Sequence, residues 1–293
     1  MKDRKQSVWV ASAALKLTRG VAAAGVLWLV AGGAVAGQQT PVAGQQTLIA
    51  RRARGPVVPD GVLGPAEWSA AVPVHVNAVK PRTAPGVVPY LPDALPFLVP
   101  PDNQDDSSFT IRALYDDQNL YVAVTVADDV LMAVHPWPLL WLDDDVEVLI
   151  DGDRQPWDFA AGVFEGVLNK EGFQLITSVG GGQQTEPGTN PDLQVWTSAV
   201  GWAPRGFVVE VAVPLDMINT HDTSEWTGGT PGFSPPQPGD TIGFNITVGD
   251  NDTGWGGYVL GGDRSNSFTA WDGSSLEWGI YLEQDWGRLY FAP

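Results

Sequence analysis

The chain has 293 residues and a formal net charge of −18, from 34 Asp and Glu against 16 Lys and Arg. Such an acidic surface repels phosphate backbones, which argues against nucleic acid as a partner. The chain has no cysteine, which excludes disulfides, thiolate catalysis and cysteine-based zinc sites. Its stability must therefore come from the size of a hydrophobic core, which a domain of about 240 residues can supply.

Residues 1–36 have the pattern of a secretory signal peptide. A basic N-terminal stretch precedes the apolar run Val21–Val30, and Ala34–Ala36 supplies the small residues of a cleavage site. A membrane anchor is the alternative, but the segment from Val21 to Ala36 is shorter than the roughly 20 residues that a spanning helix needs. We therefore expect cleavage, and a location outside the cell or at its surface.

Residues 37–55 predict a flexible linker. The segment is polar and uncharged at first, and GQQT occurs twice, from Gly37 and from Gly44. Small polar residues of this kind are typical of flexible tethers. Arg51, Arg52 and Arg54 follow, and we interpret them as a solvated stretch. The folded domain is predicted to cover residues 56–293.

The rest of the chain predicts an all-β fold. Apolar residues alternate with polar ones, and turn residues bound each run, a pattern that indicates strands. Asp116–Asn119 has the composition of a tight turn, so residues 109–128 predict a hairpin. Proline-rich segments at 79–102 and 227–240 predict long loops. We expect an antiparallel β-sandwich of the jelly-roll or immunoglobulin-like kind with long Pro/Gly-rich loops. The clearest strand patterns are Phe109–Tyr115, Leu120–Asp128, Asp145–Asp151, Gly206–Val213 and Thr241–Val248.

The acidic segment WLDDDVEVLID, Trp141–Asp151, could serve catalysis or binding. Alternation places Val146, Val148 and Ile150 on one face and Glu147 on the other. With Glu210, Glu147 could form the two carboxyl groups of a glycosidase. The alternative, which we favour, is that the two glutamates are hydrogen-bonded or solvated on their strands, because nothing in the sequence shows that they meet. No nucleophile motif or metal-binding histidine spacing supports another kind of catalysis.

Tryptophans in loops favour carbohydrate binding. Two of the chain's tryptophans, Trp68 and Trp278, lie in apolar contexts that predict packing roles. Exposed indoles carry a cost unless they contact a flat and partly apolar ligand. A sugar ring is such a ligand, because its C–H face stacks on an indole while nearby acids and amides bind its hydroxyls. The tryptophans beside Pro, Asp or Gly are Trp137, Trp141, Trp157, Trp226 and Trp255.

The turn GDNDTG predicts a calcium site at Asp250 and Asp252. Carboxylate oxygens suit Ca²⁺, which exported proteins meet at high concentration. A similar pair occurs at Asp151 and Asp153. The alternative is that these acids only stabilise turns, which Asp often does.

The order of these segments resembles the family 9 carbohydrate-binding modules, from about Val57 to Leu282. The segments are VVPDGVLGPAEWSAA, ALYDDQNLYVAVTVADD, WLDDDVEVLID, GFVVEVAVPLDMI, GDTIGFNITVGDND and FTAWDGSSLEWGIYLE. The resemblance implies a β-sandwich that binds sugars without cleaving them and that holds structural calcium. It also implies a glycan ligand and an association with secreted glycoside hydrolases.

The resemblance further implies a set of sugar-binding residues. Trp141 and Glu147 match a tryptophan and a glutamate six residues apart. Trp271 is the candidate for a second stacking tryptophan, with a packing tryptophan of the family as its other possible match. Gln174 matches a polar position, whereas Ile176 and Thr247 replace polar residues of the family.

Two further functions remain open at this stage. Related sandwiches bind haem b for electron transfer, and Met132, Met217 and His135 are the possible axial ligands here. Met132 and His135 lie too close in sequence to approach opposite faces of one haem. A cell-surface structural or assembly role is the second alternative, since the long proline-rich loops fit it.

Overall fold

A computed structural model describes residues 45–77, 106–155, 170–186, 195–223, 228–252, 266–272, 283 and 286–293. These residues form an all-β domain, as predicted. The predicted signal peptide, residues 1–36, lies outside them. No helix long and apolar enough to cross a membrane occurs in the described part. The strands are β1 (Thr47–Arg52), β2 (Val74–Val76), β3 (Ser108–Tyr115), β4 (Asn119–Ala127), β5 (Asp145–Asp151), β6 (Gly172–Ser178), β7 (Gln183–Glu186), β8 (Thr197–Ala203), β9 (Gly206–Pro214), β10 (Thr241–Asn251), β11 (Asn266–Ala270) and β12 (Gly287–Phe291), with short 3₁₀ turns η1 (Leu140–Leu142) and η3 (Leu215–Met217).

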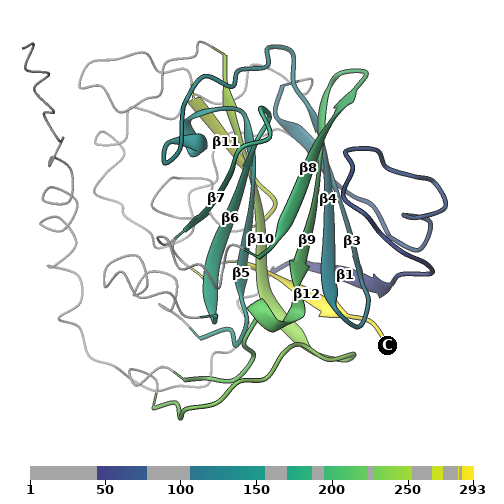
Figure 1. Cartoon of the computed structure of the whole chain (residues 1–293), viewed down its shortest axis with the longest axis vertical. Helices are drawn as coiled ribbons and strands as arrows, with labels where there is room; N and C mark the ends of the chain where they lie inside the picture. The colour runs from purple at the N-terminus through teal and green to yellow at the C-terminus, as the bar shows by residue number, and fades with distance from the viewer. Residues whose placement is uncertain are drawn as a thin grey trace, which may run out of the picture. The chain divides into compact units, whose positions relative to one another are not determined.

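The strands form two sheets that share β1. Their hydrogen-bonded order is β7-β6-β5-β10-β12-β1-β3-β4-β9-β8, with β11 on β10 and β2 on β3 (Figure 1). We call β5, β6, β7, β10, β11 and β12 the first sheet, and β2, β3, β4, β8 and β9 the second. The first half of β1 pairs with β12 and its second half with β3, both in parallel. The fold is therefore a nearly closed β-sandwich whose sheets are antiparallel except at β1.

Alternation along the strands builds one core between the two sheets. Val146, Val148 and Ile150 of β5 are fully buried in it, as their spacing predicted. Val209 and Val211 of β9 enter the same core from the second sheet. The opposite face of each strand points away from this core. Residues such as Glu147 and Glu210 therefore lie on the outer faces of different sheets.

The outer face of the second sheet carries a smaller apolar cluster. Trp68 packs there with residues of β3, β4 and β9, so its predicted packing role is confirmed. Glu210 of β9 is fully buried beneath this layer. Its carboxylate accepts hydrogen bonds from Trp68 Nε1 at 2.8 Å and from the backbone N–H groups of Gly61 at 2.8 Å and Asp60 at 3.1 Å. Residues 57–71 are thereby fixed to the sheet.

The folded domain begins earlier than the sequence indicated. Residues 45–55 were predicted to continue a linker, but Thr47–Arg52 is the strand that joins the two sheets. Leu48 and Ala50 are fully buried, while the residues between and after them are exposed. Only these two residues show the alternation of a strand, and the polar GQQT repeat directly precedes them. The signal in the sequence was therefore too weak to predict this strand. Residues 37–44 lie outside the described part.

Candidate functional site

Two aspartates of WLDDDVEVLID hold the loop that precedes η1. Asp143 Oδ1 accepts hydrogen bonds from the backbone N–H groups of Val134 at 2.9 Å and His135 at 3.0 Å, and it lies 2.8 Å from His135 Nδ1. Asp144 accepts the backbone N–H groups of Met132 and of Asn251, the latter at 2.6 Å. Both carboxylates are buried. Their role is to order residues 130–135 against β10.

Asp145 and Glu147 lie together on the outer face of β5. Asp145 Oδ1 accepts a hydrogen bond from the backbone N–H of Gly249 at 3.1 Å. Its side chain is fully buried, and Glu147 is 1% exposed. Burial, and then the charge of Glu147, raise the pKa of Asp145 well above its ordinary value. The acid groups on this face are thus buried away from bulk water. Like charges repel one another more strongly in such an environment than they do in water.

Trp141 is the aromatic residue next to this acidic face. It lies in η1, between the buried residues Leu140 and Leu142, and is itself partly exposed. Leu140 N–H donates to Gln184 Oε1 at 3.3 Å, and Asn251 Nδ2 donates to Leu142 O at 2.5 Å. The turn is therefore tied to β7 on one side and to β10 on the other. These bonds hold the indole at one end of the first sheet.

Strand register brings several predicted polar positions into neighbouring rows. Glu147 lies opposite Thr247 of β10 and Ile176 of β6, and Ile176 lies opposite Gln184 of β7. Gln174 stands one row further along β6, on the same face, and is 3% exposed. Glu147 and Gln174 thus share one face of the first sheet, and η1, which carries Trp141, lies at one end of that sheet. Gln184 was not predicted, because the short polar segment QQTE gives no strand signal.

Trp271 lies in the core. It is 1% exposed and packs edge-to-face against Phe244, with ring centroids 6.0 Å apart at an angle of 63°. A ring enclosed in this way offers no face to a ligand. Trp271 therefore has a packing role and is not the second stacking residue. A packing tryptophan of the family was its other possible match in the sequence. Trp157, Trp226, Trp255 and Trp278 lie outside the described residues.

The competing sites do not assemble. Glu147 and Glu210 point away from the core on opposite sheets, so they cannot flank one glycosidic bond. Met217 is fully buried in η3, directly after β9. The last residue of β9 pairs with the first residue of β4, so Met217 lies near the beginning of β4. His135 follows the other end of β4 and contacts Asp143. Met217 and His135 therefore cannot hold one haem between them.

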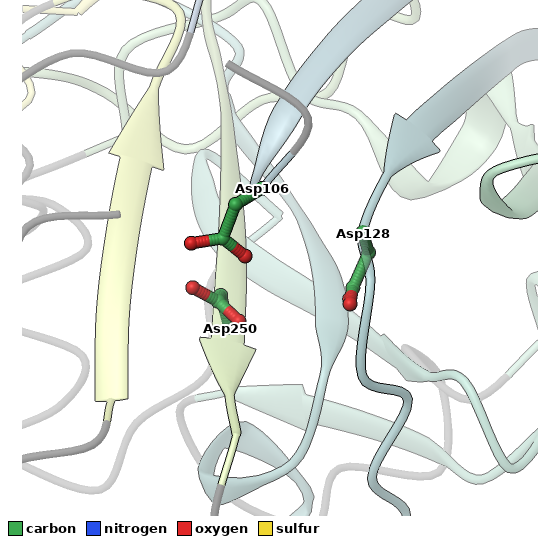
Figure 2. A group of neighbouring side chains, drawn as sticks. All are labelled: Asp106, Asp128 and Asp250. Atoms are coloured by element: carbon green, nitrogen blue, oxygen red, sulfur yellow. The ribbon is translucent and has the colours of Figure 1, made fainter. Parts of the chain in front are cut away.

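An acidic cluster lies where the two sheets meet at one end. Asp106 precedes β3, Asp128 follows β4, and Asp250 is near the end of β10. Carboxylate oxygens from the three residues lie within 4.8 Å of one another, and all three side chains are buried. Figure 2 shows the carboxylates of Asp106 and Asp250 facing each other, with Asp128 beside them. Asp106 also forms a second such group with Asp129 and Asp252.

The composition of this cluster fits a hard divalent cation. Burial, followed by the charges of Asp106, Asp252 and Asp129, raises the pKa of Asp128 to about 7. Carboxylates this close repel one another unless a proton or a cation neutralises them. Oxygen-only ligand sets are those that Ca²⁺ prefers. The predicted ligands Asp250 and Asp252 thus lie in two groups that share Asp106.

The sequence did contain a signal for the missing ligands. Asp106 precedes the predicted hairpin of residues 109–128 and Asp128 ends it, and antiparallel pairing brings the two ends of a hairpin together. By contrast, Asp151 and Asp153 accept backbone hydrogen bonds from Arg154 at 2.6 Å and Gln155 at 3.0 Å. No third acid joins that pair among the residues with described positions.

Comparison with known proteins gives the family. The family model described as carbohydrate family 9 binding domain-like matches residues 98–276, which is more than half of the chain. The chain belongs to this family. Family 9 domains are non-catalytic binding modules, so the matched part of the chain is a non-catalytic carbohydrate-binding module.

Solved structures of family 9 modules share the fold. One, from Caldicellulosiruptor kristjanssonii in complex with cellotriose, has a TM-score of 0.54 and 14% identity, over 84% of this chain and 94% of that one. A second from the same organism, in complex with glucose, has a TM-score of 0.53 and 14% identity, over 84% and 95%. At this level of identity the likeness shows the fold alone.

A sequence relative of this family 9 chain is a much longer enzyme. Endo-1,4-beta-xylanase A of Thermotoga neapolitana is 26% identical over 151 residues, which are 50% of this chain and 11% of the xylanase. The chain therefore matches only about a tenth of that protein's length.

Proposed function

We propose that this family 9 module binds plant-type polysaccharides or oligosaccharides, such as xylan or cellulose, outside the cell during carbohydrate catabolism. The observation that carries the proposal is a partly exposed indole, Trp141, fixed at the end of a sheet face that bears Glu147 and Gln174. The solved relatives in complex with cellotriose and glucose, and the xylanase relative, support this class of ligand.

Trp141 acts as the stacking residue of the proposed site. An indole gives a sugar a large and rigid apolar face at little conformational cost. Glu147 and Gln174 are the candidates for hydrogen bonds to sugar hydroxyls. Both side chains are nearly fully buried, whereas Trp141 is partly exposed. Trp141 is therefore the part of the site that meets the ligand first.

A bound Ca²⁺ at the acidic cluster belongs to the same proposal. Asp106, Asp128 and Asp250 would hold it, and Asp252 lies in the adjoining group. The cation would neutralise the carboxylates and so tie β10 of the first sheet to β3 and β4 of the second. Its role in this proposal is structural, since non-catalytic binding needs no metal-bound water.

Secreted glycoside hydrolases are the proposed partners. Binding of an insoluble substrate by a module raises the local concentration of any enzyme linked to it or working beside it. The match to one part of a xylanase supports this association. The signal-peptide pattern of residues 1–36 supports a secreted or cell-surface location.

Substitution of Trp141 by Ala tests the proposal. We expect the variant to lose retardation in affinity gels that contain soluble xylan or a soluble cellulose derivative, while the unmodified protein is retarded. The indole is partly exposed, so the thermal unfolding midpoint should stay close to that of the parent. Trp141→Phe keeps an aromatic face and should retain part of the binding. Undiminished retardation of Trp141→Ala would refute the assignment of this residue.

A further inference from the structure

A second indole close to Trp141 in the sequence is largely exposed. Trp137 is 58% exposed, and it lies in a segment that also exposes Val134 by 55% and Leu139 by 40%. These three large apolar side chains lie within six residues of one another in the sequence. Exposed apolar surface that gathers in one segment is a feature of ligand-binding sites.

The backbone around Trp137 is fixed on both sides. Upstream, Asp143 binds the N–H groups of Val134 and His135. Downstream, Leu139 N–H donates to Pro136 O at 2.9 Å. The backbone N–H of Leu140 donates to the side-chain carbonyl of Gln184. An indole on an anchored segment loses little conformational entropy when a ligand covers it, so it is preorganised for binding.

Trp137 lies within reach of a ligand bound at Trp141. The two residues are four positions apart, so their Cα atoms can be separated by at most about 14 Å even in a fully extended chain. Backbone hydrogen bonds from Leu139 to Pro136 and from Leu142 to Leu139 close two turns in this stretch and shorten that distance. The two residues are therefore close enough for one sugar chain to span both.

We propose that Trp137 is a second stacking residue, which binds a sugar ring further along a chain held at Trp141. The site then distinguishes oligosaccharides from monosaccharides. This inference rests on the proposed sugar-binding function and deepens it. Trp271, the other candidate for a second stacking residue, is enclosed in the core.

Chain-length dependence of binding tests the inference. Isothermal titration calorimetry with xylose, xylotriose and xylohexaose, and with glucose, cellotriose and cellohexaose, gives affinities for one, three and six rings. We expect the unmodified protein to bind a hexasaccharide more tightly than the matching monosaccharide. Trp137→Ala should weaken hexasaccharide binding about tenfold, which corresponds to about 1.4 kcal/mol. Its affinity for the monosaccharide should change less than twofold.

Phe233 offers a matched control. It is 49% exposed, and its ring lies 5.2 Å from the Nζ atom of Lys170. Lys170 precedes β6 at the end of the first sheet opposite η1, because Gly172 pairs with Asp151. Phe233→Ala should leave every affinity unchanged, whereas Trp141→Ala should abolish binding of all six sugars.

The outcomes separate this inference from the proposed function. Equal hexasaccharide-to-monosaccharide ratios in Trp137→Ala and the parent would overturn the role of Trp137 and leave Trp141 binding intact. Equal affinity of the unmodified protein for all chain lengths would also overturn the role of Trp137. A parent that binds none of the six sugars would overturn both proposals.

Discussion

Glu210 shows how one buried acid can be structural and not catalytic. Its carboxylate is fully buried and accepts three N–H donors, from Trp68, Gly61 and Asp60. Burial raises its pKa, and these three hydrogen bonds oppose that rise. An acid that is satisfied in this way holds a loop in place and has no free oxygen for a substrate. The same description fits Asp143 and Asp144, which bind the loop before η1.

Substitution of Trp68 by Phe should destabilise the fold without changing sugar binding. The change keeps most of the ring in the outer apolar cluster but removes the Nε1–H that donates to Glu210. A buried carboxylate oxygen that loses its donor costs about 1 to 3 kcal/mol. Urea unfolding measures the loss. Ser69→Ala, which removes a hydrogen bond at an exposed position, should change stability by less than about 0.5 kcal/mol. Equal stability of Trp68→Phe and the parent would show that this hydrogen bond contributes nothing.

At the scale of elements, close contact between two glycines joins a loop to an edge strand. A Cβ atom added at Gly201 of β8 would lie 1.8 Å from the backbone oxygen of Gly61. Gly61 itself has φ of 81°, in the left-handed region that favours glycine. Only two residues without side chains allow the backbones to approach so closely. The loop of residues 57–64 therefore covers β8 directly.

Substitution of Gly201 by Ala should force this contact apart. Overpacking of this kind costs about 1 to 3 kcal/mol or more, because backbone must move and not only a side chain. The thermal unfolding midpoint should fall accordingly. Gly55→Ala is the matched control, since no atom lies within 4 Å of an added Cβ there. That variant should be as stable as the parent or slightly more stable. A Gly201→Ala protein with unchanged thermal stability would contradict the contact.

Strong alternation made some elements predictable from the sequence and left others hidden. β3, β4, β5, β9 and β10 each send alternate apolar side chains into the core between the sheets, so their patterns were plain in the sequence. β7 and β8 are the two ends of the strand order. Their residues are polar or only partly buried, and neither was predicted. β1 was missed because only two of its residues enter the core.

The candidate site was predictable in part, for a related reason. Trp141 and Glu147 could be placed together because they lie six residues apart in one segment, a spacing that the resemblance to the family picked out. Neighbours from other strands depend on register, which the sequence does not give. The positions of Gln184 beside η1 and of Asp250 beside Asp106 and Asp128 depend on contacts between strands that are distant in sequence. Burial of Trp271 also depends on contacts across the core, here with Phe244.

On the scale of the whole domain, the two sheets are connected at separate places. β1 is shared between them on one side. Near the other side, Ser198 of β8 accepts hydrogen bonds from Thr177 Oγ1 at 3.0 Å and Gln183 Nε2 at 2.7 Å. Trp196 Nε1 donates to Thr185 Oγ1 at 2.8 Å in the same region. The acidic cluster is the third place where the two sheets meet. Its carboxylates repel one another there unless a proton or a cation neutralises their charges.

Calcium should therefore stabilise the whole domain. Millimolar Ca²⁺ should raise the thermal unfolding midpoint above that in EDTA, with a gain of about 2.7 kcal/mol when Ca²⁺ is at 100 times its dissociation constant. Asp106→Asn should remove most of this gain, because both acidic groups contain Asp106. Asp117→Asn, at an exposed aspartate outside the cluster, should retain it. Identical midpoints of the parent in Ca²⁺ and in EDTA would contradict a calcium site.

The affinity for Ca²⁺ should also depend on pH. Without the cation, burial and neighbouring acids raise the pKa of Asp128 to about 7. A protonated carboxyl must lose its proton before it can bind the cation. Apparent affinity should thus rise as pH increases from about 5.5 to about 8 and level off above the pKa of Asp128. Calorimetric titrations with Ca²⁺ across this range measure the effect. A cation held only by exposed carboxylates, which ionise near pH 4, would show a flat profile over the same range, so the slope itself distinguishes the buried cluster from surface binding.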